Sequence, residues 1–176
     1  MLVGSSSTGK STFARKHFLS TEVVSSDHCR ALVSDDENDQ TVTKEAFELV
    51  HAIIAKRLKR RRLTVVDATN VQPASRRKLI ALAKAHQVDC VAIVLDLPKD
   101  VVLQRHAARA DRKFPIDVVA RQRRELAGSL HELQQEGVRV VHILRQTQDV
   151  DGATVIKVPG ATSARSVSVP PSASPE

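Results

Sequence analysis

The sequence predicts a three-layer α/β domain, in which helices cover both faces of a mostly parallel sheet. Two observations carry this prediction. Short β-branched runs alternate with longer segments whose apolar residues recur three or four positions apart. Residues 91–95 are in addition continuously apolar, as expected for a strand covered on both faces. The length of 176 residues fits one domain with a sizeable core.

The five expected strands are short runs rich in β-branched residues, which fit a pleated and buried surface. They comprise residues 1–3, 22–25, 63–67, 88–97 and 138–144. The first run is very short, so either its strand is stunted or the protein begins upstream of Met1. Helices are expected between the runs, over residues 11–18, 46–58, 74–86, 99–110 and 119–133. Pro73 suits the first turn of the third helix, and Gly137 suits the end of the last.

The end of the chain has a different composition. Residues 159–176 hold four of the seven prolines and almost no long apolar side chain. Such a segment buries too little surface to repay its ordering entropy. We therefore expect a folded domain over residues 1–158, followed by a disordered tail or a linker over residues 159–176.

Charge and aromatic content limit the classes of partner. Lys and Arg number 27 against 20 Asp and Glu, a net charge of +7, and the only aromatic residues of the Phe, Tyr and Trp class are four Phe. This composition does not suit a single-strand binder that stacks bases on rows of aromatic side chains. If nucleic acid is a partner, contacts to its backbone charge must supply most of the affinity.

The two cysteines and the apolar runs indicate a cytoplasmic protein. Cys29 and Cys90 have no metal-ligand spacing and form no disulfide framework, which favours two reduced thiols. No apolar run approaches the ~20 residues that a membrane helix needs. Met1 to Val3 lead straight into a glycine-bearing motif, so a signal peptide is not expected either.

Residues 4–11, GSSSTGKS, match the G-x-x-x-x-G-K-[ST] pattern of a phosphate-binding loop (P-loop, Walker A) at every fixed position. An apolar strand precedes the motif and a helical segment follows it, which is the context that the motif requires. Backbone N–H groups of the loop and the helix N-terminus bind phosphate. Lys10 then reaches the β/γ oxygens, and the Ser11 hydroxyl ligates Mg²⁺. The residues expected to bind the nucleotide are Gly4, Ser5, Ser6, Ser7, Thr8, Gly9, Lys10, Ser11 and Thr12.

An acidic and a basic residue follow the second expected strand. Asp27 and Arg30 are three residues apart, so on a helical turn their side chains face the same way. In a kinase the carboxylate would accept a proton from an attacking hydroxyl, and the guanidinium would hold an anionic acceptor or orient the base. The alternative is a helix-capping Asp followed by a surface Arg. Spacing alone leaves both interpretations open.

Four stretches in consistent order resemble the kinase domain of bacterial polynucleotide kinase-phosphatase, a relative of the phage 5′-OH polynucleotide kinase. They are GSSSTGKSTFARKHF, SSDHCRALVSDDENDQ, LTVVDATN and QRHAARADR, and the resemblance extends to about residue 144. It implies a P-loop kinase-type fold with an arginine-bearing helical lid. It also implies transfer of the ATP γ-phosphate to the 5′-OH of DNA or RNA.

The resemblance assigns roles to individual residues. Asp27 corresponds to the general base, Arg30 to the contact with the acceptor phosphate, and Arg105 and Arg112 to lid arginines over the donor phosphates. One departure is Ser7, where such kinases usually carry Gly. A second is that the family's phosphatase module, and the ligase of some members, are absent from this sequence. Such modules are possible tethered or associated partners.

The arginines of the expected lid recur on one helical face, at positions 105, 109 and 112. A basic lid would neutralise charge on the transferred phosphoryl group and exclude water. The alternative is a solvated basic face. With the resemblance, the lid interpretation leads for Arg105 and Arg112, and Arg109 stays open.

Asp67 ends the third expected strand, beside the phosphate loop. A carboxylate there could hold Mg²⁺ through water, and the alternative is a loop-capping Asp. Thr69 and Asn70 are weaker candidates for the acceptor side. No other metal site is expected, because the seven histidines form no ligand constellation.

Two charged runs have ordinary structural explanations. Residues 35–39, DDEND, lack the glycine and distal Glu of an EF-hand, which favours a solvated loop before a helix. Residues 56–62, KRLKRRR, end an expected helix, where cations complement the dipole. Tracking of nucleic-acid phosphates is the second interpretation of this run.

These observations lead to the hypothesis of an ATP- and Mg²⁺-dependent polynucleotide 5′-OH kinase. A kinase of the same fold that acts on a small hydroxylated metabolite or nucleotide is the nearest alternative, and the basic excess weighs against it. A second alternative is an ATP-dependent switch or binding module without an acceptor. Such a module needs no acceptor base, so the pair formed by Asp27 and Arg30 weighs against it.

Overall fold

The structure is a computed structural model that describes residues 1–109, 115–157 and 167–168. Its centre is a set of five parallel strands. They are β1 (Leu2–Val3), β2 (Val23–Ser25), β3 (Val65–Asp67), β4 (Val91–Leu95) and β5 (Val140–Leu144). All five lie within the runs in which the sequence predicts strands, and each is shorter than its run.

The strands form two hydrogen-bonded groups that meet at β1. One group has the order β1-β4-β5 and the other joins β2 to β3, with every pair parallel. Between the groups, the Gly4 N–H donates to the Thr69 carbonyl at 2.9 Å, and Asn70 Nδ2 donates to the Leu2 carbonyl at 2.8 Å. The resulting order is β2-β3-β1-β4-β5. The prediction of a parallel sheet is confirmed.

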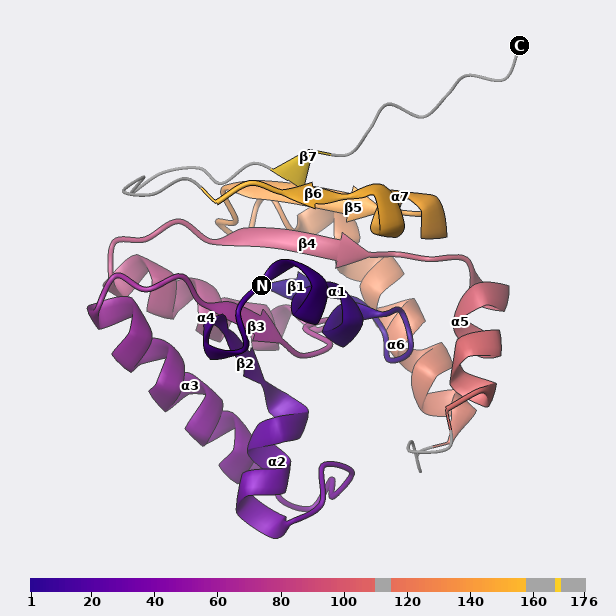
Figure 1. Cartoon of the computed structure of the whole chain (residues 1–176), viewed down its shortest axis with the longest axis horizontal. Coiled ribbons are helices and arrows are strands. Elements are labelled where there is room, and N and C mark those ends of the chain that lie inside the picture. Colours follow the sequence, from indigo (N-terminus) through magenta and orange to yellow (C-terminus); the bar gives the residue numbers. More distant parts are fainter. Residues whose placement is uncertain (110–114, 158–166, 169–176) are drawn as a thin grey trace.

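Seven helices connect or follow these strands within the described residues. They are α1 (Lys10–His17), α2 (Ser26–Ser34), α3 (Thr43–Lys59), α4 (Pro73–Ala85), α5 (Lys99–Ala107), α6 (Ile116–Ser129) and α7 (Thr147–Gly152). Figure 1 shows β4 pointing toward the right of the view, where α5 and α6 lie beyond the carboxyl ends of the strands.

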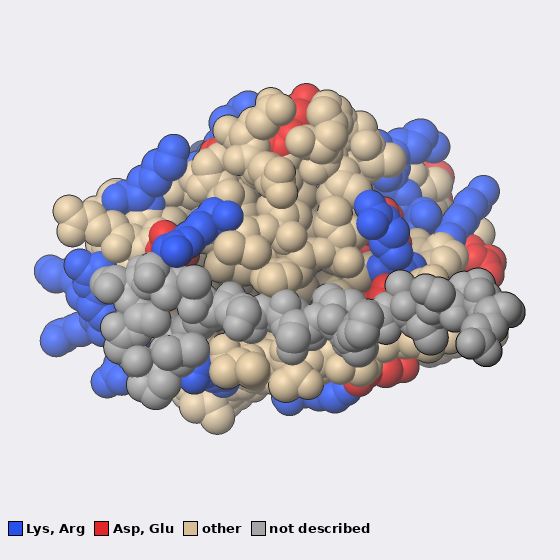
Figure 2. Space-filling model, turned by 90° about the horizontal axis from the view of Figure 1, so that it is seen from above, with Lys and Arg blue, Asp and Glu red and all other residues tan. Residues whose placement is uncertain are grey.

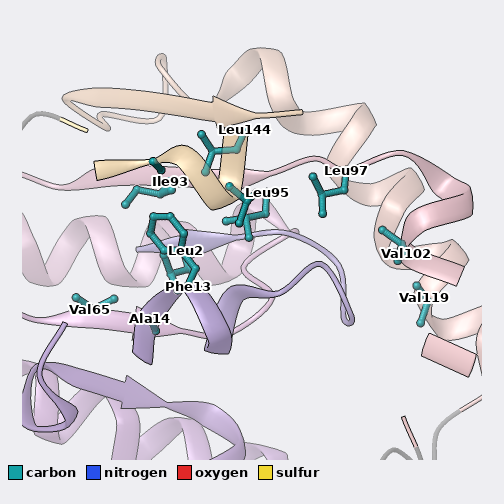
Figure 3. Close-up of a cluster of buried hydrophobic side chains, with 12 residues drawn as sticks. Leu2, Phe13, Ala14, Val65, Ile93, Leu95, Leu97, Val102, Val119 and Leu144 are labelled. Atoms are coloured by element: carbon teal, nitrogen blue, oxygen red, sulfur yellow. The ribbon is translucent and has the colours of Figure 1, made fainter. Parts of the chain in front are cut away.

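One face of the sheet packs on α1 and α7. Leu2, Ile93 and Leu144 project from three neighbouring strands into a buried cluster with Phe13 of α1 and Val150 of α7. Figure 3 shows Phe13 lying against Leu2 at the centre of this cluster. These side chains alternate along their strands with those of the opposite face, as the pleat requires.

The other face packs on α3, α4 and α6. Val3 and Val94 contact a cluster that includes Ile80 of α4 and Leu126 of α6. Farther along, β2 and β3 pack on Val50 and the neighbouring buried residues of α3. Helices therefore cover both faces, and the predicted three-layer α/β/α architecture is confirmed.

Three helices differ from the expectation. Helix α2 begins directly after β2, where the Ser25 hydroxyl accepts a hydrogen bond from the His28 N–H at 3.3 Å. Helix α7 has only six residues, which is too short for apolar periodicity to show it. Helix α6 ends at Ser129, well before Gly137, and a 3₁₀ turn over Leu130–Glu132 follows it. Leu133 is still fully buried, so the apolar stripe continues without the helix.

The last described strands form a small antiparallel pair, β6 (Thr154–Val155) with β7 (Val167–Ser168). β7 falls within the segment for which the sequence predicts a tail or linker. The rest of that segment lies outside the described residues. Among the described helices, none has the length and apolar character needed to cross a membrane.

Candidate active site

The phosphate loop connects β1 to α1 and depends on two glycines. A Cβ on Gly4 would lie 2.7 Å from the Leu95 carbonyl oxygen, so only glycine fits where the loop leaves the sheet. Gly9 precedes α1 with φ +97°, a left-handed conformation that glycine adopts without strain. Ser7 also has a positive φ of 67°, although it carries a Cβ. The position at which the kinases that this sequence resembles usually carry Gly is therefore one where this backbone favours glycine.

Lys10 is the first residue of α1, and its ammonium group lies inside the loop. Its Nζ donates to the Ser5 carbonyl at 2.7 Å, and the Thr8 hydroxyl donates to the same carbonyl at 2.9 Å. The N-terminus of α1 points into the loop and adds partial positive charge. This arrangement is a site for the phosphates of a nucleotide.

Asp27 and Arg30 lie on α2 and form an ion pair, with Arg30 Nη1 2.6 Å from Asp27 Oδ1. Ser25 caps the helix, so Asp27 is not the cap residue. Arg30 is buried at 8% exposure, so it is not a surface side chain, and no group among the residues that the structure describes hydrogen-bonds to its Nε. Both residues line the same cleft as the phosphate loop. The alternative of a capping Asp with a surface Arg is therefore wrong.

Asp67 ends β3, where it pairs in register with Ser25, two residues before Asp27. Its side chain is buried, lines the cleft and has no hydrogen-bond or ion-pair partner among the described residues. An unpaired buried carboxylate favours a bound cation. Together with the Ser11 hydroxyl, also in the cleft, Asp67 fits Mg²⁺, which binds one or two protein ligands plus substrate phosphates.

The cleft has a volume of about 880 Å³ and is lined by residues from most of the chain. Donor-side groups of the loop and α1 face acceptor-side groups of α2. The predicted site residues in its lining are Ser6, Ser7, Gly9, Lys10, Ser11, Thr12, Asp27, Arg30, Asp67, Thr69, Arg105 and Arg109. Among the described residues, no three His, Cys, Asp or Glu side chains form a metal-binding group of their own.

The expected lid contacts the loop through α5. Arg105 Nη1 donates to the Thr8 carbonyl at 3.1 Å, and the His106 ring Nδ1 lies 3.4 Å from the Ser7 hydroxyl. A Cβ on Gly9 would lie 3.2 Å from Arg105 Nη1, so this glycine also leaves room for the arginine. Arg109 lines the cleft as well. Arg112 lies outside the described residues.

Four residues of α6 that the sequence did not single out line the cleft, namely Val118, Arg121, Gln122 and Glu125. Gln122 Oε1 accepts a hydrogen bond from the Ser6 N–H of the phosphate loop at 2.8 Å, and Arg121 lines the cleft beside it. One turn farther along, Glu125 Oε1 accepts a hydrogen bond from Gln72 Nε2 of the loop before α4 at 3.1 Å. Nothing in the sequence distinguishes these polar residues from the other polar residues of an amphipathic helix, so the sequence could not predict that they line the cleft.

The two weaker candidates for the acceptor side, Thr69 and Asn70, lie in different environments. Thr69 lines the cleft. Asn70 is buried at 2% exposure, and its Nδ2 donates to the Leu2 carbonyl, so this side chain joins β3 to β1. Asn70 is therefore a structural residue and not part of the cleft.

The acidic run that begins at Asp35 is a loop before α3, as the sequence predicts. The Asp36 carboxylate accepts from the Asn38 N–H, and the Asp39 carboxylate accepts from the Thr41 N–H and hydroxyl. The hydroxyl contact lowers the pKa of Asp39. These carboxylates therefore accept hydrogen bonds from groups of their own loop and stabilise its turns.

The fold has three layers and the strand order β2-β3-β1-β4-β5, and its phosphate loop follows β1. Two carboxylates, Asp27 of α2 and Asp67 of β3, line the same cleft as this loop. Together these features define a P-loop nucleotide-binding domain of the kinase and nucleoside-triphosphatase type. Comparison with known families agrees, since the AAA domain family matches residues 1–133. The chain belongs to this P-loop family, which supports a kinase-like phosphotransferase activity. A comparison with curated proteins gives no match.

Proposed function

We propose that this protein is an ATP- and Mg²⁺-dependent kinase that transfers the γ-phosphate to the 5′-OH end of a polynucleotide. The ion pair of Asp27 and Arg30, which faces the phosphate loop across one cleft, is the observation that carries this proposal. A P-loop protein that only hydrolyses ATP needs no such pair. The resemblance to polynucleotide kinases and the net charge of +7 support a polyanionic acceptor.

On the donor side, the amides of the phosphate loop and the N-terminus of α1 bind the β- and γ-phosphates. Lys10 leaves the Ser5 carbonyl and contacts phosphate oxygens, a stronger and charge-assisted bond. Ser11 and Asp67 would hold Mg²⁺, which neutralises phosphate charge when it is bound. All these groups lie at the carboxyl end of the sheet.

On the acceptor side, Asp27 accepts the proton of the 5′-OH. The hydroxyl oxygen forms a bond to the γ-phosphorus while the bond between that phosphorus and the ADP oxygen breaks. Arg30 orients the Asp27 carboxylate through the 2.6 Å contact. Its remaining Nη donors can bind the acceptor's first phosphate in the cleft.

The lid arginines act on the donor phosphates. Arg105 already lies on the loop at Thr8, where a guanidinium stabilises charge on the transferring phosphoryl group. Arg112 is assigned the same role by the resemblance. Closure of the lid would exclude water and so favour transfer over hydrolysis.

The test uses γ-labelled ATP, Mg²⁺ and a 5′-OH oligonucleotide, with a nucleoside and a polyol as small acceptors. Label should enter the oligonucleotide, and Asp27→Asn should reduce the rate about 10²- to 10⁴-fold, the usual contribution of a general base. Asp36→Asn, at an exposed carboxylate outside the cleft lining, is the matched control and should retain the rate. Label in a small acceptor alone would contradict the polynucleotide assignment. Transfer unaffected by Asp27→Asn would contradict the mechanism.

A further inference from the structure

A second pocket, of about 770 Å³, lies at the carboxyl end of α3. Its lining consists of Ala52, Ile53, Lys56, Arg57, Arg60 and Arg62. Four of these six residues are cations and none is acidic. Figure 2 shows Lys and Arg side chains projecting at the left end of the molecule, the end at which Figure 1 places the carboxyl end of α3.

Two arginines hold the turn that presents this pocket. Arg57 Nη2 donates to the Leu63 carbonyl at 2.7 Å, and Arg61 Nη1 donates to the His86 carbonyl at 2.8 Å. Arg57 Nε is buried and has no hydrogen-bond partner among the described residues. Arg57 therefore serves the turn, and the exposed cations of the pocket are Lys56, Arg60 and Arg62.

The helix dipole explains only part of the charge. It favours cations in the last turn of α3, such as Lys56 and Lys59. Arg60 and Arg62 lie beyond the last residue of the helix and line the same pocket. Within the described part of the chain, no carboxylate forms an ion pair with Lys56, Arg60 or Arg62. Their charges are therefore available to a ligand.

Helix α3 connects this pocket to the active-site cleft. Thr43 and Phe47, in the first turns of α3, line the cleft, whereas Arg60 follows the other end of the helix. At about 1.5 Å per residue, the two ends are about 25 Å apart. A strand stacked as in B-DNA, at about 3.4 Å per nucleotide, covers that distance with about seven nucleotides.

We propose that the pocket at the carboxyl end of α3 binds backbone phosphates of the acceptor strand about seven nucleotides from its 5′ end. This inference rests on the proposed function. With the 5′ end in the cleft, binding of a distant phosphate is intramolecular, so even weak contacts raise the affinity for long strands. The second interpretation of residues 56–62, tracking of nucleic-acid phosphates, is thus favoured over a purely structural one.

The test compares the wild type with the triple variant Lys56→Ala, Arg60→Ala, Arg62→Ala. Arg57 and Arg61 stay in place because they hold the turn. The control variant removes the same charge from exposed positions outside both pockets, with Lys99→Ala, Arg124→Ala and Arg145→Ala. Circular dichroism and thermal unfolding establish that both variants are folded.

Binding is measured by fluorescence anisotropy with a labelled 15-nucleotide, 5′-phosphorylated single strand at several salt concentrations, without ATP. Three lost phosphate contacts should lower the salt slope of log Kd by about 2, at about 0.7 per contact. The Kd at 0.1 M salt should rise at least about tenfold, and the control variant should change it little. KM is then measured for 3- and 15-nucleotide 5′-OH acceptors. The triple variant should lose only the advantage of the longer strand.

Several outcomes would overturn the inference. They are unchanged 15-mer binding by the triple variant, an equal loss in the control variant, or displacement by polyglutamate as effective as displacement by unlabelled strand. The last result would assign the pocket to acidic proteins. If no 5′-OH acceptor is phosphorylated but the triple variant still loses strand binding, the proposed function fails and the binding surface stands.

Discussion

Replacing Glu136 with alanine is expected to destabilise the protein severely, because this carboxylate neutralises a fully buried arginine. Arg76 of α4 has 0% exposure. Its Nε and Nη2 donate to the two Glu136 oxygens at 2.7 and 2.5 Å. Its Nη1 donates to the carbonyls of Asn70 and Val71, in the loop that follows Asp67. The pair thus joins α4, this loop and the segment before β5.

The magnitude follows from the burial of both partners. Glu136 is itself only 10% exposed, and breaking a buried ion pair by removing one partner costs about 3 to 5 kcal/mol. For a domain of this size each kcal/mol lowers Tm by about 2 to 4 °C. Glu136→Ala should therefore lower Tm by about 6 to 20 °C.

The assay is chemical and thermal unfolding of the wild type, Glu136→Ala, Arg76→Met and the double variant Arg76→Met/Glu136→Leu. The double variant should recover much of the loss, since apolar residues can replace a buried pair at little cost. Recovery will be incomplete because the Asn70 carbonyl loses its donor from Arg76. Glu132→Ala, at a half-exposed residue whose carboxylate lies 3.7 Å from the His131 ring, should change stability by less than about 0.5 kcal/mol.

The reasoning would be refuted in either of two ways. One is a free energy of unfolding for Glu136→Ala within about 1 kcal/mol of the wild type. The other is a double variant whose loss equals the sum of the two single losses, which would mean that Arg76 and Glu136 are not coupled.

Three further predictions concern the loop, the lid and pH. Arg105→Ala should reduce the rate of phosphoryl transfer about 10²- to 10³-fold with a small change in the KM of the acceptor, as steady-state kinetics would measure; a variant with wild-type kcat would remove Arg105 from the lid role. Ser7→Val should unfold at lower denaturant concentration than Ser7→Gly, because a β-branched residue is strained at φ +67°; equal midpoints would contradict strain at this position. Burial lowers the pKa of His17, His51 and His142, so the unfolded state binds more protons than the native state below about pH 6.5. Their contribution to stability is therefore complete above pH 6.5 and is lost as pH falls through the lowered native pKa values, so unfolding midpoints should decrease from pH 7.5 to pH 5. Midpoints that increase over this interval would contradict the burial of these imidazoles.

The layered fold and the phosphate loop were predictable because their determinants are local. Apolar runs at 91–95 and at the other strands show a buried sheet through composition alone, and GSSSTGKS needs particular residues at adjacent positions. The same locality explains the errors at α6. Its apolar stripe continues to Leu133, but the backbone leaves the helix at Ser129, where the hydroxyl donates to Val71 of a distant loop.

The ion pair of Asp27 and Arg30 was only partly predictable from the sequence. Spacing placed Asp27 and Arg30 on one side of a helical turn but left their roles open. Three-dimensional packing decided that Ser25 caps α2, that Arg30 is buried and that both side chains face the phosphate loop. Burial depends on α3, which packs on α2, and no pattern within residues 25–30 reports that contact.

By itself, the sequence determined the class of fold, the phosphate loop and its glycines, since these depend on periodicity and on backbone conformations that few residues adopt. Only the tertiary structure decided that Gln122 contacts Ser6, that Arg76 pairs with Glu136 and that Asp67 lies buried in the cleft with no partner in the described part of the chain. The first of these pairs is 116 residues apart and the second 60. Many polar residues are available for such contacts, and only the packing of the helices on the sheet selects among them.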